Sequence, residues 1–184
     1  MMRDFIFKVL PNREKFGHEK LAYTDLKKIE DVVMKSLEID NMNKLRDKFE
    51  GVAFIEKFTQ KVVGIMALEK KFKINYINWE TLNPGDYQPQ ILVSGIEVDI
   101  ITCPYGNFPI INRKSNRPAI IFIKQDKRDV WICGFADTKV LNDNTSDKYL
   151  SGALMRERDN QTAFIGFDKL KSFESLQDLE NLLT

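Results

Sequence analysis

The feature of this sequence that most constrains its fold is a change of periodicity near the middle of the chain. In the first half, apolar residues recur at helical spacing over two segments, about 24 to 38 and about 42 to 72. In the second half, short runs rich in β-branched and aromatic residues are separated by Gly, Pro, Asn and Asp. We expect strands at 91–94, 96–102, 108–111, 119–124, 130–135 and 163–167, and a terminal helix from Ser175. The chain is therefore predicted to form an α/β fold with a mixed central β-sheet flanked by helices.

The length and composition predict one globular domain. The chain has 184 residues, of which 43% are hydrophobic and 30% charged, the balance of an ordinary folded protein with a substantial core. No apolar run approaches the length of a membrane span, and the first residues lack the apolar stretch of a signal peptide. We therefore expect a single soluble domain over 1–184, located in the cytoplasm and without a membrane partner. The formal net charge of +1 neither supports nor excludes nucleic acid as a partner.

The residues present disfavour several common kinds of site. Cys103 and Cys133 lie in apolar, strand-like sequence and are expected to be buried free thiols. Because His18 is the one histidine and no Cys-x-x-Cys pair occurs, a zinc site is not expected. The sequence contains neither a Gly-rich phosphate-binding loop nor a Gly-x-Ser-x-Gly elbow.

The most informative segment is the acidic strand 96–100. Because side chains alternate along a strand, Glu97 and Asp99 are predicted to lie side by side on one face, opposite the apolar residues between them. Two adjacent carboxylates repel each other and are costly to bury without a partner. A divalent cation such as Mg²⁺ or Mn²⁺, which prefers oxygen ligands, would resolve that conflict. Asp86, in a turn before the preceding strand, is a candidate third ligand if the two strands pair.

A further carboxylate, Glu56, is a candidate fourth ligand. In the helical pattern it falls on the same side as apolar residues, so we expect it to face inward, where a metal or a basic side chain would be its partner. Pairing with a lysine at the edge of the core remains an alternative for Glu56. Charged residues on the open face of an edge strand are also common, which leaves a surface role open for Glu97 and Asp99.

The arrangement resembles the core of the PD-(D/E)XK, or restriction-endonuclease-like, superfamily. The resemblance is carried by Gly85 and Asp86, the acidic strand continuing to Thr102, the strand and turn over 130–137, and the late segment 161–170. It covers about residues 45 to 180. It implies a restriction-endonuclease-like core over 45–184, preceded by an N-terminal helical region over 1–44.

The resemblance also implies roles for individual residues. Asp86 matches the first acidic position and Glu97 the second, and Glu56 matches a helix glutamate that often completes the metal site. Asp99 departs from the pattern, because it stands where the superfamily usually has lysine. Three explanations are open: an all-acid site with two metals, a lysine supplied from Lys114 or Lys124, or loss of catalysis with binding retained.

A second alignment of the motif is also possible. In that register Asp99 is the first acid, and Asn112, Arg113 and Lys114 form a degenerate version of the second motif. It is the less favoured of the two, because asparagine is a poor replacement for an anionic ligand.

Two functions are therefore expected. The first is a metal-dependent nuclease that uses Mg²⁺ or Mn²⁺ to hydrolyse phosphodiester bonds, in DNA rather than RNA, and that acts as a homodimer where both strands are cut. The second is a catalytically inactive derivative that binds nucleic acid or a protein. Basic residues in the turns beside the strands are the candidate backbone contacts, although a solvated charged loop is an equally good interpretation: Arg113, Lys114, Arg117, Lys127 and Arg128.

Overall fold

The computed structural model describes residues 1–48, 50–150 and 160–184. The α-helices are α1 (Met2–Lys8), α2 (Tyr23–Ser36), α3 (Met42–Asp47), α4 (Gly51–Phe72), α5 (Thr138–Asp143) and α7 (Leu176–Leu183). The strands are β1 (Gly17–Lys20), β2 (Gln90–Val93), β3 (Ile96–Pro104), β4 (Ile110–Asn112), β5 (Ala119–Lys124), β6 (Asp129–Ala136), β7 (Thr145–Ser146) and β8 (Gln161–Phe164). Short 3-10 helices are η1 (Leu10–Lys15), η2 (Asp147–Tyr149) and η3 (Phe167–Lys169).

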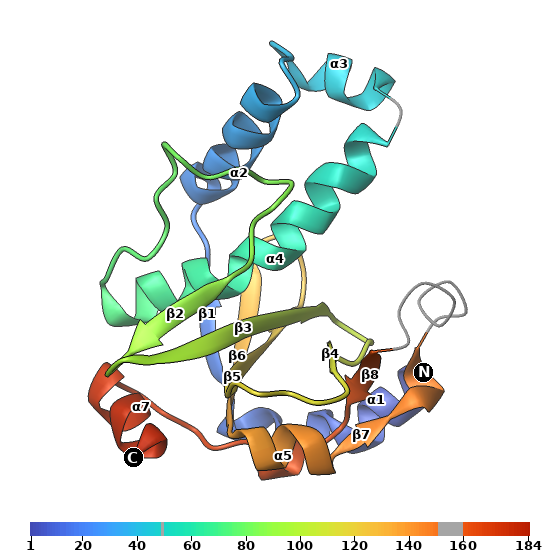
Figure 1. Cartoon of the computed structure of the whole chain (residues 1–184). Coiled ribbons are helices and arrows are strands. Elements are labelled where there is room, and N and C mark those ends of the chain that lie inside the picture. Colours follow the sequence, from blue (N-terminus) through green and yellow to red (C-terminus); the bar gives the residue numbers. More distant parts are fainter. Residues whose placement is uncertain (49, 151–159) are drawn as a thin grey trace.

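The strands form two sheets (Figure 1). The larger has the order β1-β6-β5-β3-β2, in which β3 and β5 run parallel and every other neighbouring pair is antiparallel. The smaller sheet has the order β4-β8-β7 and is antiparallel. The prediction of a mixed sheet flanked by helices is confirmed. Among the residues described, no helix is both long enough and apolar enough to cross a membrane.

Helix α4 covers one face of the larger sheet (Figure 1). Its buried face, which includes Phe58 and Val62, packs with Val98 and Ile100 of β3 and with side chains of α2, α3 and α7 in one apolar core. Gly64 permits the closest approach, because a Cβ at that position would collide with the Thr102 hydroxyl and lie 3.0 Å from Ile100 Cγ2. The contact explains why a glycine is tolerated in the middle of a long helix despite its low helix propensity.

The opposite face of the sheet carries a second apolar core. Phe5 of α1, Ile121 of β5 and Phe164 of β8 are fully buried there, with the side chains of Cys103 and Cys133 among them. Both cysteines are free, as predicted, and burial raises the pKa of each thiol well above its ordinary value. This second core joins the two sheets, and it therefore fixes where β4 and β8 lie relative to β3.

Some predicted elements are interrupted or shifted. The helical pattern over 42–72 is two helices, α3 and α4, because Glu50 adopts a left-handed conformation with φ of 61° and the chain turns before Gly51. The strand expected at 108–111 begins at Ile110 and belongs to the smaller sheet. The terminal helix begins as predicted, with the Ser175 hydroxyl accepting a hydrogen bond from the Asp178 N–H at 3.1 Å.

Candidate functional site

Glu97 and Asp99 lie on the same face of β3, and both approach the guanidinium of Arg117. Arg117 Nη1 is 2.6 Å from Glu97 Oε2 and donates to Gln90 Oε1 at 3.1 Å, while its Nε is 3.5 Å from Asp99 Oδ1. Strand pairing produces this arrangement, because Asp99 is opposite Gln90 on β2 and opposite Ala119 at the start of β5, just after Arg117. The predicted adjacency of the two carboxylates is confirmed, and the guanidinium of Arg117 contacts both of them.

The surroundings treat the two carboxylates differently. The side chain of Glu97 is 51% exposed, whereas that of Asp99 is 33% exposed. Burial raises the pKa of Asp99, the charge of Glu97 raises it further, and the Arg117 guanidinium opposes both. The fold therefore resists the ionisation of Asp99.

The other two predicted metal ligands lie elsewhere. Asp86 is exposed in a turn, where it accepts a hydrogen bond from Asn83 Nδ2 at 3.0 Å, and none of its contacts in the described chain reaches Glu97 or Asp99. Glu56 is exposed, so the expectation that it faces inward is wrong. The reason is its position on α4: two residues before the buried Phe58, it lies about 200° away around the helix. Within the ranges that the structure describes, no three His, Cys, Asp or Glu side chains are grouped to hold a metal ion.

The basic residues proposed as nucleic-acid contacts fall into two groups. Arg113, Lys114 and Arg117 lie in the loop before β5, where Arg113 Nη1 forms an ion pair of 2.8 Å with Asp147 Oδ2. Lys127 and Arg128 lie after β5, about 20 Å away along a six-residue strand. Lys124 ends the same strand and is therefore also remote from Asp99.

Arg128 is held by its own neighbourhood. Its Nε donates to the Leu21 carbonyl at 2.7 Å, and its guanidinium lies 3.9 Å from the centre of the Tyr23 ring. These contacts join the β5–β6 turn to the start of α2 and give Arg128 a structural role.

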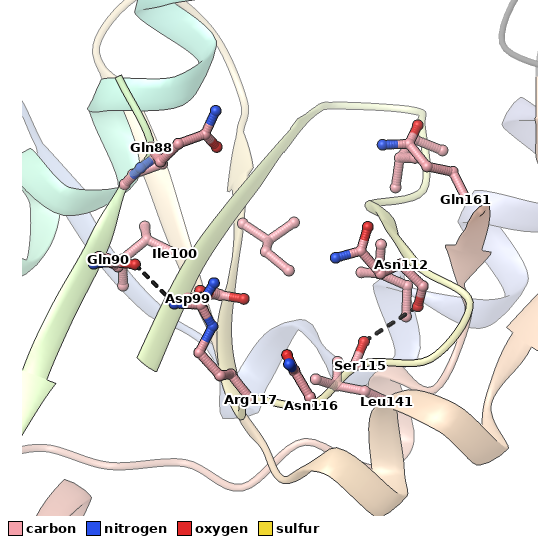
Figure 2. Close-up of a pocket in the computed structure, with 14 residues that line it drawn as sticks. Gln88, Gln90, Asp99, Ile100, Asn112, Ser115, Asn116, Arg117, Leu141 and Gln161 are labelled. Carbon is pink, nitrogen blue, oxygen red and sulfur yellow. Dashed lines mark hydrogen bonds and ion pairs between the residues drawn. The ribbon is translucent and has the colours of Figure 1, made fainter. Parts of the chain in front are cut away.

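Beside the ion pairs of Arg117 with Glu97 and Asp99 lies a cavity of about 340 Å³, which we call the polar basin (Figure 2). The chain encloses it by running from β3 to β4 and back through the loop 113–118 to β5, with α5 below. Five carboxamide side chains belong to its lining, together with the Asp99 and Arg117 pair: Gln88, Gln90, Asn112, Asn116 and Gln161. Figure 2 shows Gln88 and Gln90 on one side of the basin, facing Asn112 and Gln161 on the other.

The loop that forms one wall of the basin is held by hydrogen bonds. Asn142 of α5 accepts from the Ser115 N–H at 2.8 Å and donates to the Ser115 carbonyl at 3.0 Å. The Ser115 hydroxyl donates to the Asn112 carbonyl at 3.2 Å. These bonds fix the backbone between β4 and β5, so the basin is formed before any ligand arrives.

Several of the lining amides are available to a ligand. The side chains of Gln88, Asn112 and Asn116 make no hydrogen bond to any other residue in the described chain. Gln90 has its carbonyl oxygen engaged by Arg117, which leaves its NH₂ group as a donor. The basin therefore offers both donors and acceptors in fixed positions.

The motifs of the sequence do not single out this group of amides as a site. The recognisable pattern lies in the carboxylates and the basic residues, where Asn112 appears only as a degenerate acidic position. A usable signal is present in the sequence, because Gln88 and Gln90 lie at the start of the acidic hairpin while Asn112 and Asn116 flank Arg113 and Lys114. Carboxamides at the ends of neighbouring strands would have predicted a polar pocket there.

Comparison with known proteins gives no match for this chain: no protein-family model matches it, and no curated protein or solved structure is significantly similar to it.

Proposed function

We propose that this protein is a binding module and that its site is the polar basin. The observation that carries the proposal is the set of five carboxamides around one cavity, three of them without a hydrogen-bond partner among the described residues. A concave site with a few fixed polar groups and an apolar floor is the usual form of a ligand site. Ile101, Ile110 and Leu141 supply the apolar part of the lining.

The charges favour binding over metal chemistry as the function of this site. Among the described residues that line the basin, the opposite charges of Asp99 and Arg117 balance each other, so the lining carries no net negative charge to attract a cation. Asp86 and Glu56 lie in other surroundings. A ligand that donates and accepts hydrogen bonds suits this site better than an ion.

The proposal is tested by NMR titration of the ¹⁵N-labelled protein with a panel of small polar compounds: nucleosides, monosaccharides and amino-acid amides. We expect the side-chain NH₂ signals of Gln88, Asn112 and Asn116 to shift, because these groups line the basin. The exposed Asn43 on α3 is the internal control and should not shift. Shifts confined to other parts of the chain, or no shifts with any compound, would overturn the proposal.

A metal-dependent nuclease acting on DNA is the second candidate function. It is favoured by the two adjacent carboxylates of Glu97 and Asp99 on one strand face, the feature on which the resemblance to PD-(D/E)XK nucleases also depends. As they stand, these residues do not fit Mg²⁺ or Mn²⁺, because the guanidinium of Arg117 lies where the cation would have to bind. Simultaneous cutting of both strands of DNA would use a second copy of the chain.

Calorimetric titration of Mn²⁺ into the wild type and into Arg117→Ala distinguishes the two candidates. If Glu97 and Asp99 form a metal site, removing the guanidinium should raise Mn²⁺ affinity at least about tenfold, because two carboxylates are then uncompensated. The double variant with Glu97→Ala should lose that gain. Plasmid nicking that depends on Mn²⁺ and on Glu97 would establish the nuclease, and absence of Mn²⁺ binding in all three proteins would exclude it.

A further inference from the structure

We propose that the polar basin receives a single unpaired nucleobase, presented by a nucleotide or by a nucleic-acid strand. The inference rests on the proposed function, since it names the ligand class of the same site. It is drawn from the hydrogen-bonding groups, the apolar surface and the charge of the basin.

The hydrogen-bonding groups match the edge of a base. A carboxamide presents an NH₂ donor and a carbonyl acceptor side by side in one plane. Purine and pyrimidine edges present donors and acceptors in the same in-plane manner, and Asn or Gln pairs with adenine through two hydrogen bonds. Figure 2 shows Asn112 across the basin from Gln88 and Asn116 beside Arg117, so amides that line different parts of the basin can contact two edges of one planar ring.

The apolar surface matches the faces of a base. Ile101, Ile110, Ile111 and Leu141 are among the residues that line the same cavity as the amides; Ile101 and Ile110 are partly exposed, and Ile111 and Leu141 are almost fully buried. Enzymes that extract a base from a helix hold its faces between apolar or aromatic side chains and its edge by hydrogen bonds. A sugar, which carries hydroxyl groups around its ring, would bring polar groups against Ile101 and Ile110 without partners for them.

The charge of the basin suits an uncharged group. Asp99 and Arg117 are the charged residues in the described lining, and they form an ion pair with each other. A phosphate placed within the basin would meet the Asp99 carboxylate, whereas a base is uncharged at neutral pH. The phosphate therefore belongs outside, and the exposed Lys114 lies in the rim loop between the lining residues Asn112 and Ser115.

The test is a titration of the ¹⁵N-labelled protein with the four common nucleosides, their 5′-monophosphates, glucose and glycinamide. We expect at least one nucleoside to shift the basin amides. The Asn112→Ala and Asn116→Ala double variant should bind it about tenfold more weakly, because two hydrogen bonds are lost. Asn43→Ala is the matched control and should bind like the wild type. Both substituted positions are exposed, so unchanged melting temperatures are expected for all variants.

The failures of the two proposals are distinguishable. Basin shifts with glucose or glycinamide and none with any nucleoside would overturn the nucleobase inference and leave the binding site standing. Nucleoside binding that the double variant does not weaken would also overturn it. No basin shift with any compound would remove both proposals.

Further arms identify how the base is presented. Lys114→Ala should leave nucleoside affinity unchanged and weaken a 5′-monophosphate about threefold, by loss of one exposed charge contact. If the base comes from a strand, a single-stranded oligonucleotide should bind more tightly than the mononucleotide and more tightly than the same sequence as a duplex. If it comes from a free nucleotide, the mononucleotide should bind at least as tightly as the strand.

Discussion

The two faces of the larger sheet differ in how completely they are closed. On the face covered by α4, apolar residues from the helix and from alternating strand positions form one core, in which Val62, Ile100 and Phe122 are buried. On the other face, α1 and the smaller sheet cover the sheet near Cys103 and Phe164 but leave the polar basin beside Asp99. Because β4 belongs to the smaller sheet and not to the larger one, a cavity remains beside Asp99 while the core beneath it stays buried.

The largest expected effects test whether the two cores form one cooperative unit. Phe122 faces α4 and Phe164 lies in the core on the opposite face, and both are fully buried. Replacing either with alanine should lower the free energy of unfolding by about 3–5 kcal/mol, because each leaves a large cavity. Chemical denaturation followed by circular dichroism measures both variants.

The shape of the unfolding curve decides the comparison. A single transition in both variants supports one unit in which the basin side is as firmly held as the α4 side. A second, earlier transition in Phe164→Ala alone would show that the smaller sheet unfolds separately, and the basin would then lack a rigid support on that side.

A smaller effect is expected at the closest contact on the α4 face. Gly64→Ala adds a methyl group against the Thr102 hydroxyl and close to Ile100 and Phe122. Overpacking of this kind costs about 1–3 kcal/mol and should exceed the gain of about 1 kcal/mol in helix propensity. Thermal denaturation should show a lower melting temperature, partly restored by Thr102→Ala. A more stable Gly64→Ala variant would contradict the tight packing.

Much of the fold follows from periodicity in the sequence. The strands around 119–124 and 130–135 are predictable because each is a concentrated apolar run, and the strand around 96–102 is predictable because apolar residues alternate with Glu97 and Asp99. The break between α3 and α4 was not, because it depends on the left-handed conformation of Glu50, which local sequence does not favour. Strand β1 was also missed, because its four residues include His18, Glu19 and Lys20 and it is stabilised by pairing with β6 rather than by its own pattern.

The site was predictable only in part. The adjacency of Glu97 and Asp99 follows from strand alternation, which is a local property. The position of Arg117 between them depends on the parallel pairing of β3 with β5, which is a tertiary property. For the same reason the sequence does not predict that Gln88 and Asn112 line one cavity. They are separated by 23 residues, and Asn112 belongs to the smaller sheet.

A modest effect on stability is expected from the ion pairs that Arg117 forms beside the polar basin. Arg117→Met removes the partner of Glu97 and Asp99, all three of which are partly exposed. The free energy of unfolding should fall by up to about 1 kcal/mol at low salt, with a smaller difference at high salt because exposed charges are screened. Denaturation at two ionic strengths measures this difference. A loss of several kcal/mol, independent of salt, would mean that Arg117 supports the fold rather than the basin.

The smallest effect distinguishes Asp99 from an ordinary surface carboxylate by its pH dependence. Because the pKa of Asp99 is raised, mainly by burial, the folded chain holds this proton more tightly than the unfolded chain. Its contribution to stability is present below the ordinary value of 3.8 and is lost as pH rises through the folded-state pKa.

Asp99→Asn cannot titrate, so its stability relative to the wild type should rise as the pH is raised from below 3.8 to neutrality. Asp147→Asn is the matched control of opposite sign, because hydrogen bonds from Arg113 and Thr162 lower the pKa of Asp147. Its stability relative to the wild type should fall over the same interval, since the wild type gains stability as Asp147 ionises. Thermal unfolding of the three proteins across this pH range measures both slopes. A slope for Asp99→Asn with the same sign as that for Asp147→Asn would mean that the ion pair with Arg117 outweighs burial at Asp99, and it would contradict a raised pKa for this carboxyl.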